Sequence, residues 1–190
     1  MSSFQASCGS VYNKYLTSIA PCSHLLKFYE TDEELLDVLE KFVLSGLHSS
    51  EACIVIATDE HRAALRRRLA ERGIDVQQEA HEGFYIDIGA RETLEQFMRN
   101  EWPDSERFEA VIRDVIMSAS GDGRAVRAFG EMVALLWSDD CEDAAIRLEY
   151  LWNNIIPAED LSLFCAYPAE VCGSSEFVHN VQVAHSGMMP

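Results

Sequence analysis

A continuous run of apolar, largely β-branched residues, Cys53–Ala57 (CIVIA), constrains the fold of this chain more than any other segment. Such a run predicts a strand covered on both faces, because a half-exposed strand alternates apolar and polar residues. Thr58 and Asp59 follow it directly and are residue types that begin helices, and Gly73 is typical of a helix end. The segment therefore predicts one strand of a buried parallel sheet, followed by a helix.

The same order of strand and helix recurs along the chain. Short apolar runs predict further strands at His24–Tyr29, Phe84–Ile88, Ala125–Phe129 and Leu161–Tyr167. Apolar residues at helical spacing predict further helices over 31–47, 93–98, 105–118, 132–136 and 143–156. Alternating elements of these lengths predict an α/β fold in three layers, a mainly parallel sheet flanked by helices.

One domain is expected from a chain of 190 residues. Residues 1–22 show no apolar pattern and are interpreted as a flexible leader. The pattern of strands and helices predicts a domain over 23–170. We expect residues 171–190 to form a C-terminal extension toward a partner or an output module.

The formal net charge of −17 argues against nucleic acid as a partner, because such proteins neutralise phosphates with basic side chains. One predicted helix is an exception and carries five arginines, Arg62, Arg66, Arg67, Arg68 and Arg72. These side chains either dock an acidic partner, with Arg62, Arg66 and Arg67 as the contact, or form a solvated face that balances nearby acidic helices.

No apolar run approaches the roughly 20 residues that cross a bilayer, so we expect no membrane contact and a cytoplasmic protein. The six cysteines form no C-x-x-C pair and are expected to be reduced thiols. No group of histidines and cysteines has the spacing of metal ligands, which predicts no metal and no cofactor. The six scattered histidines are interpreted as surface or capping residues.

Polar and aromatic residues gather where the predicted strands end. In open parallel sheets, ligands bind beyond the carboxyl ends of the strands. The residues predicted to form such a ligand site are Tyr29, Glu30, Thr58, Asp59, Arg127, Phe129, Glu131, Trp137 and Tyr167. In this hypothesis Glu131 and Tyr29 supply polar contacts, and the other aromatic residues supply apolar walls.

Each of these residues also has a structural interpretation. Glu30, Thr58 and Asp59 can serve helix starts, and Trp137 can be a core residue. Arg127 and Glu131 lie inside the apolar segment 126–137, where a buried charge needs a partner. Glu131 therefore either faces a pocket or closes an internal salt bridge. Arg127 can pair with Glu131 or equally with Glu149.

The motifs of the common enzyme classes are absent. The turn after the first strand, Tyr29–Glu34, contains no G-x-x-x-x-G-K-[ST] sequence, and its acidic residues would repel phosphates. The Gly121-Asp122-Gly123 segment precedes a predicted strand and is interpreted as a turn. No G-x-S-x-G or H-E-x-x-H sequence occurs. These observations predict a protein that is not an enzyme.

Five segments, taken together and in order, resemble the MEDS family, the methanogen/methylotroph DcmR sensory domains. These segments are HLLKFYETDEELL, ACIVIATDEHRAAL, RAFGEMVALLW, AIRLEYLWNN and LSLFCAYP, and they span residues 24–168. The resemblance implies a RecA- or KaiC-like fold without a phosphate-binding loop. It also implies a ligand or signal sensor of bacterial and archaeal regulators, with small hydrocarbon derivatives proposed as ligands.

We therefore expect a non-catalytic sensory or regulatory domain that binds a small ligand of unknown identity or a partner protein. The resemblance implies a histidine kinase or a transcription regulator as output. We expect the chain to act on a separate partner or to be a piece of a longer protein, and homo-oligomers are compatible with the fold. The alternatives are an ATPase-like enzyme with an unusual phosphate loop, and an adaptor that binds through the arginine-rich helix.

Overall fold

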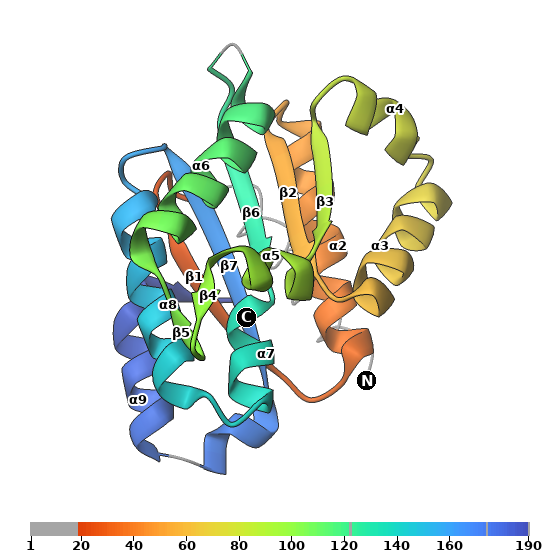
Figure 1. Ribbon diagram of the computed structural model, residues 1–190. Helices are drawn as coiled ribbons and strands as arrows, with labels where there is room; N and C mark the ends of the chain where they lie inside the picture. The colour runs from red at the N-terminus through yellow and green to blue at the C-terminus, as the bar shows by residue number, and fades with distance from the viewer. Residues whose placement is uncertain (1–18, 122, 174, 190) are drawn as a thin grey trace, which may run out of the picture.

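A parallel sheet of six strands forms the centre of the computed structural model, which describes residues 19–121, 123–173 and 175–189 (Figure 1). The strand order is β3-β2-β6-β7-β1-β8, and every neighbouring pair is parallel. The strands are β1 His24–Tyr29, β2 Ala52–Ala57, β3 Tyr85–Gly89, β6 Val126–Gly130, β7 Leu161–Pro168 and β8 Gly187–Met188. All six residues of β2 are buried, as the apolar run predicted.

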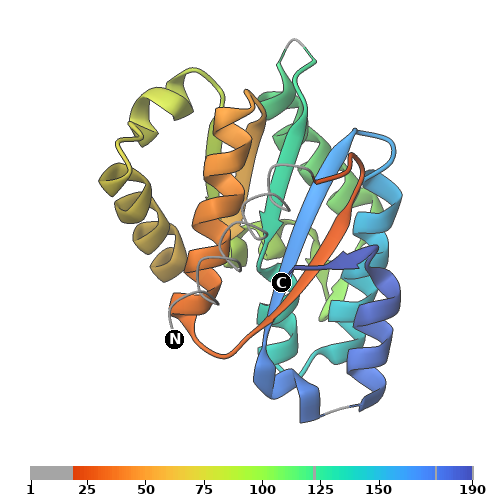
Figure 2. The same ribbon diagram turned by 180° about the vertical axis from the view of Figure 1, so that it is seen from behind.

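Helices cover both faces of the sheet and complete the predicted three layers. Figure 1 shows α6, α7 and α8 in front of the sheet, and the reverse view in Figure 2 shows α2 in front of the opposite face. One face carries α2 Asp32–His48 and α3 Asp59–Glu71. The other carries α5 Ala90–Phe97, α6 Ser105–Ser120, α7 Met132–Ser138, α8 Glu142–Ile155 and α9 Ser175–Ala184.

Two hydrophobic cores lie on opposite faces of the sheet because side chains alternate along each strand. In β2, Ile54 and Ile56 join the core under α5 to α9, whereas Cys53, Val55 and Ala57 join the core under α2 and α3. The two cores are therefore separated by the sheet itself.

Side-chain caps begin both helices of the α2/α3 face directly after a strand. The hydroxyl of Thr31 accepts from Glu34 N at 3.2 Å, and the Glu34 carboxylate accepts from Glu30 N at 2.9 Å. Thr58 caps α3 in the same manner by accepting from His61 N. These short connections place Thr31 and Thr58 at the carboxyl edge of the sheet.

Several short elements were not predicted from the sequence. The helix α4 Val76–His81 buries none of its residues, so it has no apolar period to detect. The hairpin of β4 Met98–Arg99 and β5 Trp102–Pro103 has strands of two residues each. A 3₁₀ helix, η1, covers Ala169–Gly173.

The C-terminal segment packs on the domain in the structure. Phe177 and Val181 of α9 are buried in the core that also contains α8, and β8 pairs with β1. Whether this segment also reaches a partner stays a prediction. Of the predicted leader 1–22, residues 1–18 lie outside the described part of the chain.

No helix in the described part of the chain combines the length and the apolar character that crossing a membrane requires. The described cysteines Cys22, Cys53, Cys141, Cys165 and Cys172 are all free thiols. Cys53 and Cys165 are buried, in agreement with their positions in apolar strands.

The prediction that Arg127 pairs with Glu131 or Glu149 is wrong. The Arg127 guanidinium pairs with Glu51 and donates to Phe42 O at 3.1 Å. The reason is geometric, since Arg127 lies on the face of β6 that meets α2, whereas Glu149 lies on α8 across the sheet.

Gly46 on α2 permits the close approach of Arg127 to that helix. A Cβ atom at this position would lie 2.6 Å from Cys53 Sγ and 2.7 Å from Arg127 Cδ. Both neighbours are buried, and Arg127 is held by its ion pair, so neither side chain can move aside easily. The glycine is therefore required by packing and not by an unusual backbone angle.

The Gly46→Ala variant is expected to unfold more easily. Overpacking costs about 1 to 3 kcal/mol, and the better helix propensity of alanine offsets about 1 kcal/mol. We expect a net loss of about 1 kcal/mol in the free energy of unfolding, measured by urea denaturation. Gly173→Ala is the control, because a Cβ there meets no atom within 4 Å. A Gly46→Ala protein as stable as the wild type would contradict this packing.

Candidate functional site at the strand ends

The carboxylate of Glu131 lies at the carboxyl edge of the sheet and connects three segments. Its backbone N–H donates to Ile56 O at 2.9 Å, directly after β6. One carboxylate oxygen accepts from the backbone N–H of Thr58 at 2.8 Å, and the other lies 2.7 Å from His61 Nδ1. Glu131 is only 4% exposed. Its charge is therefore satisfied within the protein, at the start of α3.

His61 extends this network to α2. Its Nε2 lies 3.5 Å from a carboxylate oxygen of Asp32, in the first turn of α2. The hydrogen bond to Glu131 raises the pKa of His61, burial opposes the rise, and the charges of Glu131 and Asp32 reinforce it. The prediction of a surface or capping role is wrong for this histidine, which is buried at 8% exposure.

Tyr29, the last residue of β1, is the aromatic member of the site. Burial raises the pKa of its hydroxyl well above the usual range, and the negative charges of Glu131, Asp32 and Glu170 raise it further. The hydroxyl is therefore protonated at neutral pH. The carboxylates of Glu131, Asp32 and Glu170 place negative charge around Tyr29, which disfavours the binding of phosphate there.

A small pocket of about 270 Å³ opens next to this network. The lining residues come from the end of β2 and the starts of α3 and α5, with one side chain from α7: Ala57, Thr58, Asp59, Glu60, Ala90, Arg91, Glu92 and Leu135. Arg91 contacts Asp139 at 3.0 Å on the rim. The pocket combines a few apolar side chains with charged groups on a scale suited to a small molecule.

The structure brings some predicted site residues together and separates others. Thr58 and Asp59 line the pocket, while Tyr29 and Glu131 lie in the network beside it. Asp59 also pairs with Arg62, and Glu30 is exposed. Sequence reasoning missed Arg91, which lies two residues after the end of β3, and Leu135, which lies inside α7 and follows no strand directly.

Four predicted residues lie away from the pocket. Phe129 is fully buried in the core under α2, and Arg127 sits near the start of the same strand. Tyr167 faces the opposite core and donates to Glu149 at 2.8 Å. Trp137 is half-buried against that core. Phe129, Arg127 and Tyr167 lie on predicted strands, and the alternation of side chains sends Tyr167 to the opposite face from Phe129 and Arg127. Trp137 lies on α7, beyond the strand end.

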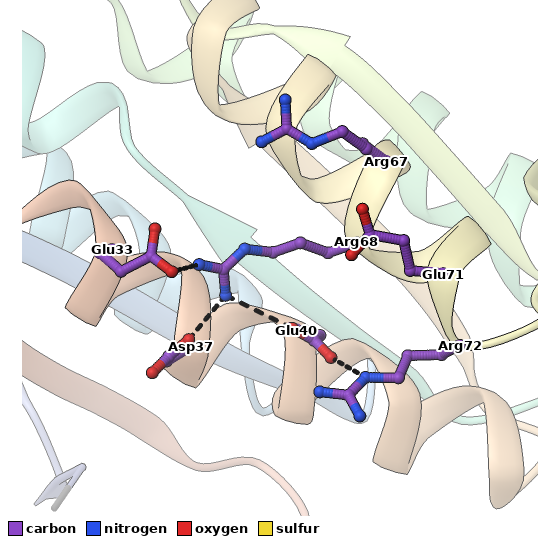
Figure 3. A pocket seen from close by; sticks show the side chains of 7 residues that line it. All are labelled: Glu33, Asp37, Glu40, Arg67, Arg68, Glu71 and Arg72. Carbon is purple, nitrogen blue, oxygen red and sulfur yellow. Dashed lines mark hydrogen bonds and ion pairs between the residues drawn. The ribbon is translucent and has the colours of Figure 1, made fainter.

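Three arginines of α3, Arg62, Arg66 and Arg68, form ion pairs within the domain. Arg68 reaches Asp37 at 2.6 Å and Glu40 at 3.3 Å on α2, as Figure 3 shows. Arg62 and Arg66 both pair with Asp87 of β3. Arg67 is exposed, and Figure 3 draws no contact from it to the acidic residues of the groove between the helices. A role of Arg62, Arg66 and Arg67 in partner binding stays a prediction.

A second group of chemically capable side chains is buried on the other face. His24, Glu149, Cys165 and His185 direct one possible metal-ligand atom each toward a common centre, and these atoms lie within 4.8 Å of one another. The prediction that His24 and His185 are surface residues is wrong, since their side chains are 3% and 1% exposed. Sequence spacing could not reveal this group, because its members come from four separate segments.

Comparison with known proteins identifies a family and a fold. The family model of MEDS, the methanogen/methylotroph DcmR sensory domain, matches residues 23–185. The fold is similar to the crystal structure of a KaiC-like protein from the hyperthermophilic archaeon Pyrococcus horikoshii, with a TM-score of 0.64 and 12% identity. That match covers 90% of this chain and 73% of the other. No curated protein matches the sequence.

The Glu131→Gln variant is expected to be less stable than the wild type. A glutamine amide is neutral and has one acceptor oxygen, so Thr58 N and His61 Nδ1 both lose a charged partner and one of them also loses its acceptor. Hydrogen bonds to charged groups contribute about 1.5 to 3 kcal/mol, so we expect a loss of that order in urea denaturation. Glu30→Gln, at an exposed position nearby, is the control and should change little. Equal stability of Glu131→Gln and wild type would refute the bracing role.

The raised pKa of His61 predicts a pH dependence of stability. A histidine whose pKa is higher in the folded state contributes its full stabilisation below the unfolded value of about 6.5. This contribution disappears as pH rises through the folded-state pKa. NMR titration of the ring should give a pKa above the ordinary value in the wild type and a lower pKa in Glu131→Gln. Titration of the wild-type ring at or below the ordinary value would disprove the contact.

Proposed function

Because the chain belongs to the MEDS family of sensory domains, we propose that it binds a small ligand in the strand-end pocket and signals this state to a partner protein. The observation that carries the proposal is the position of the pocket. Its wall at Thr58 is hydrogen-bonded to Glu131, and through His61 this network reaches α2. A ligand seated there contacts the same residues that hold three segments together.

The lining of the pocket limits the class of ligand. A volume of about 270 Å³ suits a molecule of few heavy atoms. Ala57, Ala90 and Leu135 provide apolar surface, while Thr58 and Arg91 provide hydrogen-bonding groups. We propose a small organic molecule with one polar group, which is compatible with the hydrocarbon derivatives that the family resemblance implies.

The route to a partner is proposed to run through α7 and α8. Leu135 lines the pocket from α7, and Glu131 lies directly before the first residue of that helix. The helix α7 packs on α8, so a displacement of α7 is passed to the helix that faces solvent beside α9. A ligand that binds one arrangement of α7 more tightly shifts the population toward it. The proposed receiver is a cytoplasmic histidine kinase or transcription regulator.

We further propose that the domain is not an enzyme. The turn between β1 and α2 carries Glu30, Asp32 and Glu33, and its Thr31 and Glu34 are used to cap the helix. No glycine-rich loop follows the strand, and the nearby Glu131 is engaged by His61 and Thr58. This arrangement supports binding and offers neither a phosphate cradle nor an activated nucleophile.

Filling the pocket should abolish ligand binding without unfolding the domain. The Leu135→Trp variant places a larger side chain at a half-buried position of the lining. The measurement is thermal unfolding in a panel of short-chain alcohols, aldehydes and halogenated hydrocarbons, where a bound compound raises the Tm. We expect at least one compound to stabilise the wild type and to leave Leu135→Trp unchanged.

The matched control is Met117→Trp, at a position of α6 that is 60% exposed and outside the pocket. It should respond to the compound as the wild type does. A compound that stabilises Leu135→Trp equally would show that the strand-end pocket is not its site.

A further inference from the structure

The buried group of His24, Glu149, Cys165 and His185 lies where the start of the domain, at β1, meets the segment after α9. His24 begins β1, Glu149 lies on α8, Cys165 lies in β7, and His185 follows α9. Glu149 and Cys165 are completely buried, and His24 is 2% exposed. Polar groups so deeply buried need hydrogen-bond partners or opposite charges within the protein, because water does not reach them.

The hydrogen bonds around the two histidines fix which ring nitrogens carry protons. The side-chain nitrogen of Asn153 donates to Ala184 O at 2.9 Å, so its oxygen faces His24 Nδ1, also at 2.9 Å. His185 Nδ1 lies 2.6 Å from Val181 O. Both Nδ1 atoms are therefore donors. In the neutral rings, each Nε2 then carries a lone pair that points to the common centre.

Too few protons are available for the atoms that meet at this centre. The two Nε2 atoms and Glu149 Oε2 are all acceptors, and the thiol of Cys165 supplies one hydrogen. Among the described residues, neither Glu149 Oε2 nor His185 Nε2 has a hydrogen-bond partner. Protonation of both histidines is unfavourable, since their ring centroids are only 3.9 Å apart. A cation at the centre would satisfy all four groups.

Three of the six distances between the four atoms are close to the edge length of a tetrahedral metal site. Zn²⁺ bonds of 2.0 to 2.3 Å imply ligand-to-ligand distances of about 3.3 to 3.8 Å. Glu149 Oε2 lies 3.2 Å from His24 Nε2 and 3.6 Å from His185 Nε2, and Cys165 Sγ lies 3.5 Å from His24 Nε2. The remaining pairs lie within 4.8 Å.

The residues around these atoms orient them as the outer shell of a metal site does. Histidine ligands donate their second ring N–H to a carbonyl or amide oxygen, and ligating carboxylates accept a further hydrogen bond. Asn153 and Val181 serve the two histidines, and the Tyr167 hydroxyl donates to the other oxygen of Glu149 at 2.8 Å. Three of the four ligands, the two histidines and Glu149, are thus held in position from outside the group.

We propose that His24, Glu149, Cys165 and His185 bind one divalent transition metal ion, with Zn²⁺ the best match to two nitrogens, one oxygen and one sulfur. Four protein ligands leave no open position, as in structural zinc sites. The ion would fasten the C-terminal segment after α9 to β1, β7 and α8. Metal binding would deprotonate the Cys165 thiol and release its proton.

The test is a Co²⁺ titration of the full chain, purified without a polyhistidine tag and stripped with a chelator. We expect one Co²⁺ per chain, with the strong visible absorption of a tetrahedral site and a near-ultraviolet sulfur-to-cobalt band, both displaced by Zn²⁺. Cys165→Ser should lose the sulfur band. Asn153→Ala, which frees the His24 ring, should weaken binding about 10- to 100-fold.

Two matched controls identify binding elsewhere. Cys53→Ser changes a buried thiol on the opposite face of the sheet, and His179→Gln changes an exposed histidine of α9. Both should bind Co²⁺ as the wild type does. The proposal would be overturned if the wild type bound Co²⁺ without the sulfur band, in octahedral geometry or at more than one site. An unchanged spectrum in Cys165→Ser would overturn it as well.

A measurement on the wild type alone covers the case in which a ligand variant fails to fold. X-ray absorption of the Zn²⁺-loaded protein should show one sulfur and three lighter ligands, and Zn²⁺ should raise the Tm. A zinc shell without sulfur, or no binding in the presence of excess Zn²⁺, would show that a proton and not a metal joins these four residues.

Discussion

The buried carboxylate of Glu131 is the interaction on which the strand-end edge depends. It accepts from the backbone N–H of Thr58, the residue that caps α3, and contacts the ring of His61, while its own backbone N–H donates to Ile56 O of β2. Such a charge is stable out of water only because every partner is in place. The same contacts fix the turn after β6, the start of α3 and the approach of α2. The network also fixes the position of Thr58, which lines the adjacent pocket.

The strands have a KaiC-like arrangement, but the helix starts at their carboxyl edge are engaged by contacts within the domain. Nucleotide sites of this kind rely on free backbone amides at a helix start. Here the amide of Thr58 is occupied by Glu131, and the caps Thr31 and Glu34 occupy the start of α2. Acidic groups surround Tyr29. Fold similarity therefore does not carry a shared chemistry, and the sensory assignment comes from the family.

Local patterns predicted the fold well because each depends on neighbours in the sequence. The apolar run of β2 and the caps at Thr31 and Thr58 needed no knowledge of distant residues. The partners of Arg127, His61 and His24 could not be predicted in this way, because strand pairing and helix return bring them together. Alternation along β6 sends Arg127 to α2, and the return of the chain after α9 buries the His24 ring. The site was therefore predicted as a region and not as a set of contacts.

Direct titration with ATP and Mg²⁺, followed by calorimetry and phosphate release, tests most sharply whether this strand-end edge detects and does not transform. An edge with occupied amides and surrounding carboxylates predicts no binding heat and no shift in Tm at millimolar ATP. It also predicts no release of phosphate above the rate without protein. Saturable binding at micromolar ATP, with hydrolysis that requires the chain, would contradict the central claim.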